Sequence, residues 1–361
     1  MRRGLMHWSH AEMPAEVLAQ RVQRLQQAMS AQGLEAVLAW TNFAQPAVVH
    51  WLTHFTPYWS EAVLAVPARG PVVLLAALTP RVHDWIRSVC RVDRVVAAPR
   101  LGEAVARWLD EAVTDRAARI GVVGLEAAPW PVLQPVLQGR GAGVLVDAAG
   151  LYRGIRQPAD TAEMGLARRA QAIGQAAWDA VTPGLRDTAG LTARVEAAAR
   201  LAGAEELLLR VAPDLARSTV AVRPEPVLPL GPRYAVEMSI AYKGAWVRLA
   251  RSIVRDGGAE PAAWAAARVF FDRLARGTWA SAGSPPEPPP GLRLQHWQLE
   301  ASVDAWPLAC AAQHPGGAAS ALPPGSLAVL SARIATAQGG WNGATPVVVT
   351  ATGLHALDAT A

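Results

Sequence analysis

The stretch that decides the fold reads Tyr234-Ala-Val-Glu-Met-Ser-Ile-Ala-Tyr-Lys-Gly-Ala-Trp-Val-Arg-Leu-Ala-Arg-Ser-Ile253. Two mainly apolar segments flank its Lys-Gly pair. Glu237 lies in the first segment and Arg248 in the second. A guanidinium group stays protonated and has no lone pair to offer a cation. A metal site built on this stretch would therefore have to form without Arg248.

Length and composition bound the class of protein. The chain has 361 residues, of which 52% are apolar and 17% charged, so we expect two domains with substantial cores. No apolar run reaches the ~20 residues of a membrane span, and residues 1–10 lack the apolar segment of a signal peptide. We therefore expect a cytoplasmic protein with no membrane partner.

The charge pattern gives little evidence about partners. The net charge is +5, and Lys243 is the only lysine among many arginines. These arginines are scattered and form no basic stripe with interleaved aromatic residues, so we predict no nucleic-acid partner. Cys90 and Cys310 are isolated in sequence, and we expect both to be buried thiols.

The first half of the chain alternates between helical and strand patterns. Apolar residues recur at helical spacing through residues 14–33, where Gly33 ends the predicted helix. Short apolar runs predict strands, and the second and third of them read as a hairpin: residues 36–40, 62–66, 72–75, 120–124 and 144–147. Strands alternating with helices over about 150 residues indicate a compact α/β domain.

The quoted stretch resembles the strand pair of the pita-bread peptidases, which include methionine aminopeptidase, aminopeptidase P, prolidase and creatinase. His50-Trp-Leu-Thr-His-Phe55, and residues 58–67 after it, resemble the N-terminal domain of creatinase, prolidase and aminopeptidase P. The resemblance implies an α/β creatinase-like N-terminal domain over residues 1–150. It also implies an α+β pita-bread domain over residues 151–361, with helices flanking a curved sheet, and a homodimer.

In those peptidases two Asp, one His and two Glu hold a pair of metal ions. Aligned on Tyr-Lys-Gly, the two Asp positions fall on Glu237 and Arg248. The segment Leu294-Gln-His-Trp-Gln-Leu-Glu300 resembles the run that carries the ligand histidine and places His296 there.

The two remaining positions have lost their carboxylates. The motif Leu322-Pro-Pro-Gly325 places Ser331 at the first Glu, and Thr345-Pro-Val-Val-Val-Thr350 places Ala344 at the second. One carboxylate and one imidazole then remain beside an arginine, which is too few donors for two divalent ions. We predict that the chain uses no metal and no other cofactor.

Creatinase resembles this chain in fold and works without a metal, using a histidine base on a loop before the strand pair. The chain has no histidine between His83 and His296, and the matching loop, residues 217–226, contributes arginines and Glu225 instead. A direct copy of the creatinase mechanism is therefore not expected.

Two interpretations of the remaining charged residues stay open. In one, Glu237 and Arg248 form a buried ion pair that replaces metal bridging and implies no activity. In the other, Glu237 is a general base and Arg248 binds a substrate carboxylate through its planar fork. His296 has the pKa range for proton transfer, although a lone histidine is also common as an ordinary core or surface residue.

Four further residues are candidates for substrate binding. Arg223 borders the expected cleft, and Ser331 lies at a former ligand position with no base beside it to make it a nucleophile. Trp246 lies in the motif segment and could line a pocket for a flat or cationic ligand. The resemblance implies that the region of His54 reaches the partner's active site in a dimer.

Two functions follow, with a small-molecule or short-peptide ligand in both. The first is a metal-independent, creatinase-like enzyme acting on a C–N bond of a small amino-acid-derived or amidine-like substrate, with Glu237 and His296 as catalytic residues. The alternative is a non-catalytic pseudo-peptidase that binds a peptide or small ligand in the former active-site cleft. An ordinary metallopeptidase would require a different alignment of the strand pair.

Overall fold

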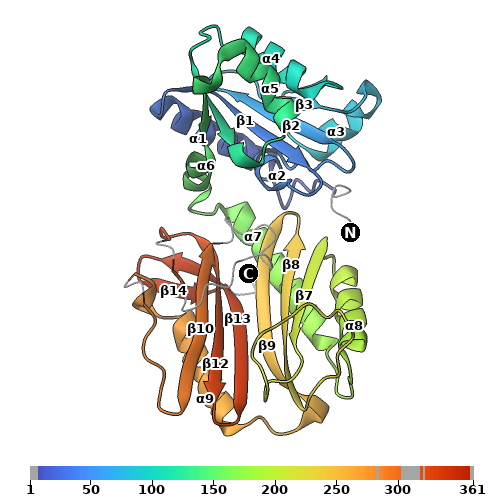
Figure 1. Ribbon diagram of the computed structural model, residues 1–361, viewed down its shortest axis with the longest axis vertical. Helices are drawn as coiled ribbons and strands as arrows, with labels where there is room; N and C mark the ends of the chain where they lie inside the picture. Colours follow the sequence, from blue (N-terminus) through green and yellow to red (C-terminus); the bar gives the residue numbers. More distant parts are fainter. Residues whose placement is uncertain (1–6, 282–283, 302–317, 320–321, 358–361) are drawn as a thin grey trace. The chain divides into compact units, whose positions relative to one another are not determined.

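A computed structural model describes residues 7–281, 284–301, 318–319 and 322–357 of the chain. The chain divides into two compact units, Arg2–Arg156 and Gln157–Ala361. Each unit is built around one β-sheet (Figure 1). Within the described ranges, no helix is both long enough and apolar enough to cross a membrane.

The N-terminal unit contains a six-stranded mixed sheet in the order β4-β3-β2-β1-β5-β6. β1 runs parallel to β5, and β5 parallel to β6, whereas β2 is antiparallel to both β1 and β3. The predicted strands and the predicted hairpin are confirmed. The strands are β1 Leu34–Asn42, β2 Glu61–Pro67, β3 Val73–Ala76, β4 Arg94–Ala97, β5 Arg119–Val123 and β6 Leu145–Asp147.

Helices complete the α/β architecture of this unit. The first helix, α1, spans Ala15–Ala31 as predicted, and Gly33 follows it with a positive φ of 64°. α4 and α5 pack on each other, and their apolar residues join alternate residues of the sheet in one core. The other helices of the unit are α2 Ala47–Thr53, α3 His83–Val89, α4 Leu101–Ala112, α5 Trp130–Arg140 and α6 Ala149–Arg156.

The C-terminal unit contains an eight-stranded sheet in the order β11-β10-β12-β13-β9-β8-β7, with β14 paired to β13. Its long strands are antiparallel, as the pita-bread resemblance implies. The strands are β7 Glu206–Ala212, β8 Arg233–Tyr242, β9 Ala245–Val254, β10 Leu292–Ala301, β11 Ala318–Ala319, β12 Leu327–Thr336, β13 Gly339–Thr350 and β14 Gly353–Ala356.

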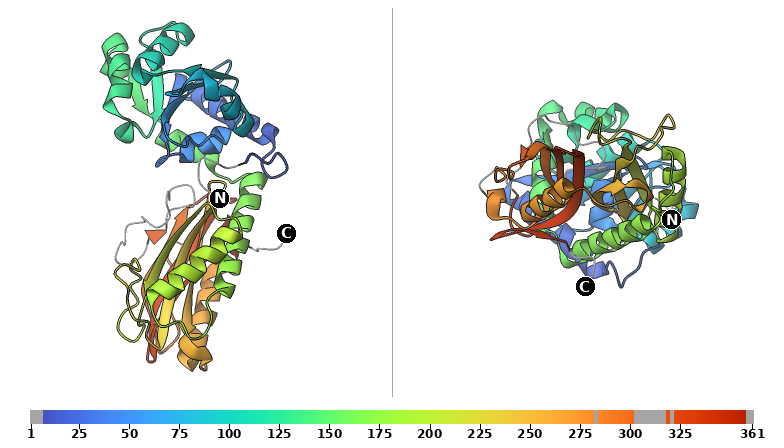
Figure 2. Two further views of the ribbon diagram at one scale, coloured as in Figure 1. Left: turned by 90° about the vertical axis from the view of Figure 1, so that its right-hand side faces the viewer. Right: turned by 90° about the horizontal axis from the view of Figure 1, so that it is seen from below.

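Helices cover one face of this sheet. α7 (Thr161–Asp179) packs on β8 and β9, and Figure 2 shows it running along these strands. α9 (Ala262–Ala275) packs on β12 and β13, where Trp264 and Phe270 lie in the main core. α8 (Thr188–Leu201) is capped at its N-terminus by the Asp187 carboxylate, which accepts a hydrogen bond from Gly190 N.

The β8–β9 turn fixes the register of the site. Lys243 and Gly244 form a two-residue turn with φ values of 46° and 80°, as a tight hairpin matched to the strand twist requires. Tyr242 then pairs with Ala245, Ser239 with Arg248, and Glu237 with Ala250. Since side chains alternate across a strand, Glu237 and Arg248 lie on the same face as diagonal neighbours.

Candidate functional site

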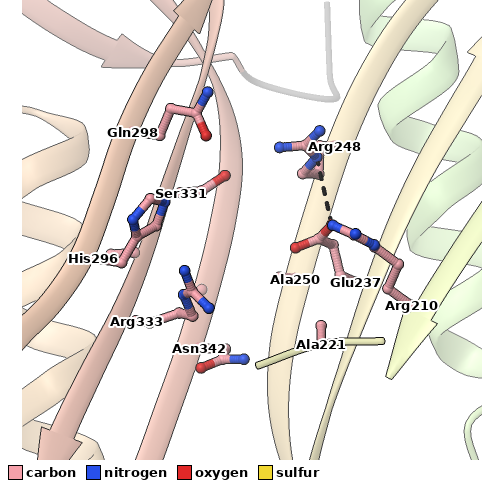
Figure 3. A pocket seen from close by; sticks show the side chains of 12 residues that line it. Arg210, Ala221, Glu237, Arg248, Ala250, His296, Gln298, Ser331, Arg333 and Asn342 are labelled. Carbon is pink, nitrogen blue, oxygen red and sulfur yellow. Dashed lines mark ion pairs between the residues drawn. The ribbon is translucent and has the colours of Figure 1, made fainter. Parts of the chain in front are cut away.

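The face of the C-terminal sheet opposite the helices carries a polar cavity (Figure 3). Its volume is about 50 Å³, which is room for roughly three to five water molecules. The side chains around it come from six strands and one loop: Arg210, Ala221, Glu237, Arg248, Ala250, His296, Gln298, Ser331, Arg333 and Asn342.

Strand register explains why the cavity lies where it does. One row of paired residues crosses the sheet from β10 to β7: Gln298, Ser331, Ala344, Ala250, Glu237 and Arg210. The two central positions of that row carry only methyl groups, so the middle of the face is hollow while its flanks are polar. His296, Arg333 and Asn342 form the adjacent row.

Glu237 lies between two guanidinium groups. Its Oε1 atom is 3.7 Å from Arg248 Nε and 4.0 Å from Arg210 Nη1. The Glu237 side chain is 21% exposed and that of Arg248 only 6%. These ion pairs are therefore shielded from solvent more than surface pairs are, and each group depends on its partners for compensation of its charge.

Arg248 also joins two distant strands. Its Nη1 atom is 3.4 Å from Glu300 Oε2, and its Nε atom donates to Ser239 Oγ over 3.4 Å. Glu300 lies on β10 and Glu237 on β8, on opposite sides of β12, β13 and β9 in the sheet order. One buried guanidinium group thus connects the carboxylates of the two halves of the sheet.

Arg333 projects toward the cavity from β12, opposite Asn342 in register. Burial lowers the pKa of Arg333 below its usual value; nearby Glu237 opposes this shift and Arg210 adds to it. Asn342 is 6% exposed, and its Nδ2 donates to the carbonyl of Thr219 over 2.8 Å.

Four residues predicted from the sequence line this one cavity: Glu237, Arg248, His296 and Ser331. Arg223 is exposed on the loop that contributes Ala221, and it is not among the lining residues. Trp246 is 4% exposed and packs with Ala241, Val329 and Ala344 beside the cavity.

His54 belongs to the N-terminal unit. It ends α2 in a left-handed conformation, with φ of 68°, and is 3% exposed. Its Nδ1 lies 3.0 Å from the carbonyl oxygen of Val89, and its ring is near those of His50 and Trp8. These contacts are those of a packed residue, and its proposed role at a partner's site stays a prediction.

The sequence argument missed Arg210, Arg333, Gln298 and Glu300. Three of them could have been found from strand alternation, because they follow assigned residues at even spacing. Arg333 lies two residues after Ser331, and Gln298 and Glu300 follow His296 by two and four. Arg210 is different, because only the β7–β8 register brings it opposite Glu237.

Comparisons with known proteins agree with this architecture. Residues 21–157 match the family described as the creatinase/prolidase N-terminal domain. The N-terminal unit is a creatinase/prolidase N-terminal domain. A comparison with the curated proteins finds no match.

Solved structures extend the likeness to the whole chain. A dipeptidase PepE from Mycobacterium ulcerans is 18% identical with a TM-score of 0.63, and the match covers 96% of each chain. A prolidase from Pyrococcus horikoshii is 13% identical with a TM-score of 0.62, covering 94% of this chain and 97% of the other. An X-Pro aminopeptidase from Thermotoga maritima is 14% identical with a TM-score of 0.64, covering 93% and 97%. The predicted creatinase and prolidase fold is confirmed.

The resemblance to metal-dependent members of the creatinase/prolidase fold raises the question of a metal pair, and the residues present do not fit one. Within the described part of the chain, no three His, Cys, Asp or Glu side chains come together as a ligand set. Glu237 and His296 share the cavity with the cationic groups of Arg210, Arg248 and Arg333. Guanidinium groups repel a divalent ion and supply no lone pair.

Proposed function

We propose that this chain is a metal-independent pseudo-peptidase, in which the cleft of a peptidase-like fold binds a small ligand. One observation carries this proposal. Arg248 stands at a position that the resemblance assigns to a metal ligand, and it pairs with both Glu237 and Glu300. A positive side chain thus does the bridging that metal ions do between carboxylates, which leaves the cleft polar and shaped for a ligand.

Metal content tests this proposal. The protein is purified without chelator, and its manganese, iron, cobalt, nickel and zinc are counted by elemental mass spectrometry. We expect well below one ion per chain, and no activity toward Xaa-Pro dipeptides after addition of Mn²⁺, Co²⁺ or Zn²⁺. A stoichiometric ion, or dipeptide hydrolysis that a metal restores, would contradict the proposal.

A second candidate function is supported by the placement of Glu237 and His296 in the same cavity. Together they could move a proton to and from a small amino-acid-derived or amidine-like substrate while its C–N bond breaks. In this hypothesis Glu237 accepts a proton from a water molecule whose oxygen bonds to the substrate carbon, and His296 donates a proton to the nitrogen that leaves as the C–N bond breaks.

Turnover of a panel of small amidines and N-acyl amino acids, followed by release of amine or urea, tests the second candidate. Glu237→Gln and His296→Gln should each lower the rate by roughly 10²- to 10⁴-fold, the usual contribution of a general acid or base. Arg293→Gln changes an exposed β10 residue outside the lining and should leave the rate unchanged. Wild-type rates in both cavity variants would contradict this catalytic hypothesis, and ligand binding would then be the only proposed function.

The homodimer also remains a proposal. Exposed aromatic residues of the N-terminal unit, Trp59 at 57% and Phe43 at 41%, support a protein interface because large exposed apolar groups often mark one. Light scattering at micromolar concentration should give twice the mass of one chain, and a monomeric mass would contradict it.

A further inference from the structure

Arg248 is already engaged by the protein. Glu237 and Ser239 lie beside its Nε atom, and Glu300 lies beside Nη1. With 6% of its side chain exposed, it has little surface left for a bidentate contact with a ligand. The sequence analysis proposed that Arg248 binds a substrate carboxylate. Another residue is therefore needed for that role.

Arg333 fits that role. It lines the same cavity from β12, across from Glu237 and Arg210 (Figure 3). Within the described residues no hydrogen bond or ion pair within 4.0 Å reaches its guanidinium group, although the group is partly buried. Burial lowers its pKa, which reflects the cost of keeping the positive charge away from water.

The charge balance of the cavity calls for an anion. Among the described residues, three guanidinium groups, of Arg210, Arg248 and Arg333, face the two carboxylates of Glu237 and Glu300, which leaves one positive charge in excess. Glu237 is shared between Arg210 and Arg248 at 4.0 and 3.7 Å. A planar carboxylate matches the fork of a guanidinium group and can accept two hydrogen bonds from it.

Asn342 defines a second feature of the ligand. Its Oδ1 atom is buried and accepts no hydrogen bond from the described residues, while Nδ2 is held by Thr219. An unpaired buried acceptor is costly, so a ligand donor next to the anionic group would be favoured. The cavity volume of about 50 Å³ restricts both groups to a compact molecule.

We propose that Arg333, assisted by Arg210, recognises the ligand, and that the ligand is a compact carboxylate with an adjacent O–H or N–H donor. This inference rests on the proposed use of the cleft without a metal ion. It adds the residue that binds and the chemical class that is bound.

Ligand-observed NMR titration tests the inference with four probes: glycolate, glycolamide, acetate and inorganic phosphate. Glycolate carries both the carboxylate and the donor, glycolamide lacks the charge, and acetate lacks the donor. We expect glycolate to bind most tightly and Arg333→Gln to weaken it roughly 10- to 100-fold, the range for a charged hydrogen bond. The glycolate affinity of Arg333→Lys should lie between those of the wild type and Arg333→Gln, because lysine keeps the positive charge but lacks the planar fork of the guanidinium group.

Thermal melting separates recognition from a structural role. Arg333→Gln removes a partly buried charge without an ion-pair partner within 4.0 Å, so its melting temperature should equal or exceed that of the wild type. Arg293→Gln, the same change at an exposed position of β10, should alter neither melting nor binding.

Several outcomes would overturn the inference. Equal binding of glycolamide and glycolate would show that charge is not recognised, and tighter binding of phosphate would assign the cavity to an inorganic oxyanion. Unchanged glycolate affinity in Arg333→Gln, or a lower melting temperature for that variant, would make Arg333 structural. None of these results would show that the protein holds a metal ion. Failure of the proposed ligand recognition by Arg333 can therefore be distinguished from failure of the proposed metal-independent function.

Discussion

The two faces of the C-terminal sheet are made by the same strands and differ in almost every physical respect. On β8, Met238 and Ile240 are fully buried under the helices, whereas Glu237 lies between two arginines and lines the cavity on the opposite face. On β12, Leu330 and Ala332 join the main core, while Ser331 and Arg333 line the cavity. Alternation along a strand thus separates a stabilising face from a face available for binding.

This difference teaches where stability and chemistry reside. The covered face, which lies under the helices, stabilises the fold through burial of apolar area, and this effect is non-directional and tolerant of small shifts. The open face, which carries the polar cavity, holds charged groups, and the cost of removing these groups from water offsets much of their mutual attraction. We therefore expect substitutions on the covered face to change stability most, and substitutions on the open face to change binding most.

The largest expected effect is on the covered face. Phe270 of α9 is 1% exposed within the main core, so Phe270→Ala should lower the free energy of unfolding by about 3–5 kcal/mol. Urea denaturation followed by circular dichroism measures this loss. The neighbouring Val269 is 59% exposed, and Val269→Ala should change stability by less than about 0.5 kcal/mol. Equal losses in the two variants would contradict the assignment of the covered face.

A smaller effect is expected on the open face. Glu300→Gln removes one of the two carboxylates that pair with the buried Arg248, and should cost about 1–3 kcal/mol of stability because a charge-assisted hydrogen bond is lost. The same urea titration measures it.

A double-mutant cycle sharpens this prediction. Arg248→Met removes the positive charge, so Glu300→Gln should cost much less in that background than in the wild type. Additive losses would show that the 3.4 Å contact between Arg248 and Glu300 contributes no coupling, and the two halves of the sheet would then be joined by backbone pairing alone.

Much of the scaffold could be predicted because its signals are local. Gly33 ends α1, and Lys243-Gly244 makes the turn that sets which residues of β8 and β9 share a face. Apolar runs located five of the six strands of the N-terminal unit, and missed β4. The resemblance then placed Glu237, Arg248, His296 and Ser331, and these four line one cavity.

The charge balance of the site could not be predicted in the same way. Arg210 faces Glu237 only through the β7–β8 register, and the 20-residue segment 213–232 between these strands leaves that register undetermined by sequence spacing. Glu300 reaches Arg248 across two intervening strands, β12 and β13. Both contacts depend on tertiary pairing, so a sequence that correctly yields Glu237 and Arg248 as a pair still misses the network around them.

The smallest expected effect at neutral pH concerns Cys90, a titratable group in packed surroundings like those of the covered face. It is 3% exposed in the N-terminal unit, as predicted for a buried thiol, whereas Cys310 lies outside the described residues. Burial raises the pKa of Cys90 from 9.0 to about 12, so iodoacetamide at pH 8 should leave it unmodified until the protein is unfolded, as peptide mapping can show.

The sign of the pH dependence follows from the same shift in Cys90. The fold favours the neutral thiol, so its contribution to stability is present below pH 9 and is lost as pH rises toward 12. Between pH 9 and 11, wild-type protein should therefore lose stability faster than Cys90→Ala, which lacks the titrating group. Parallel losses in the two proteins, or rapid alkylation of native Cys90, would mean that this position is open to water, unlike the covered face of the C-terminal sheet.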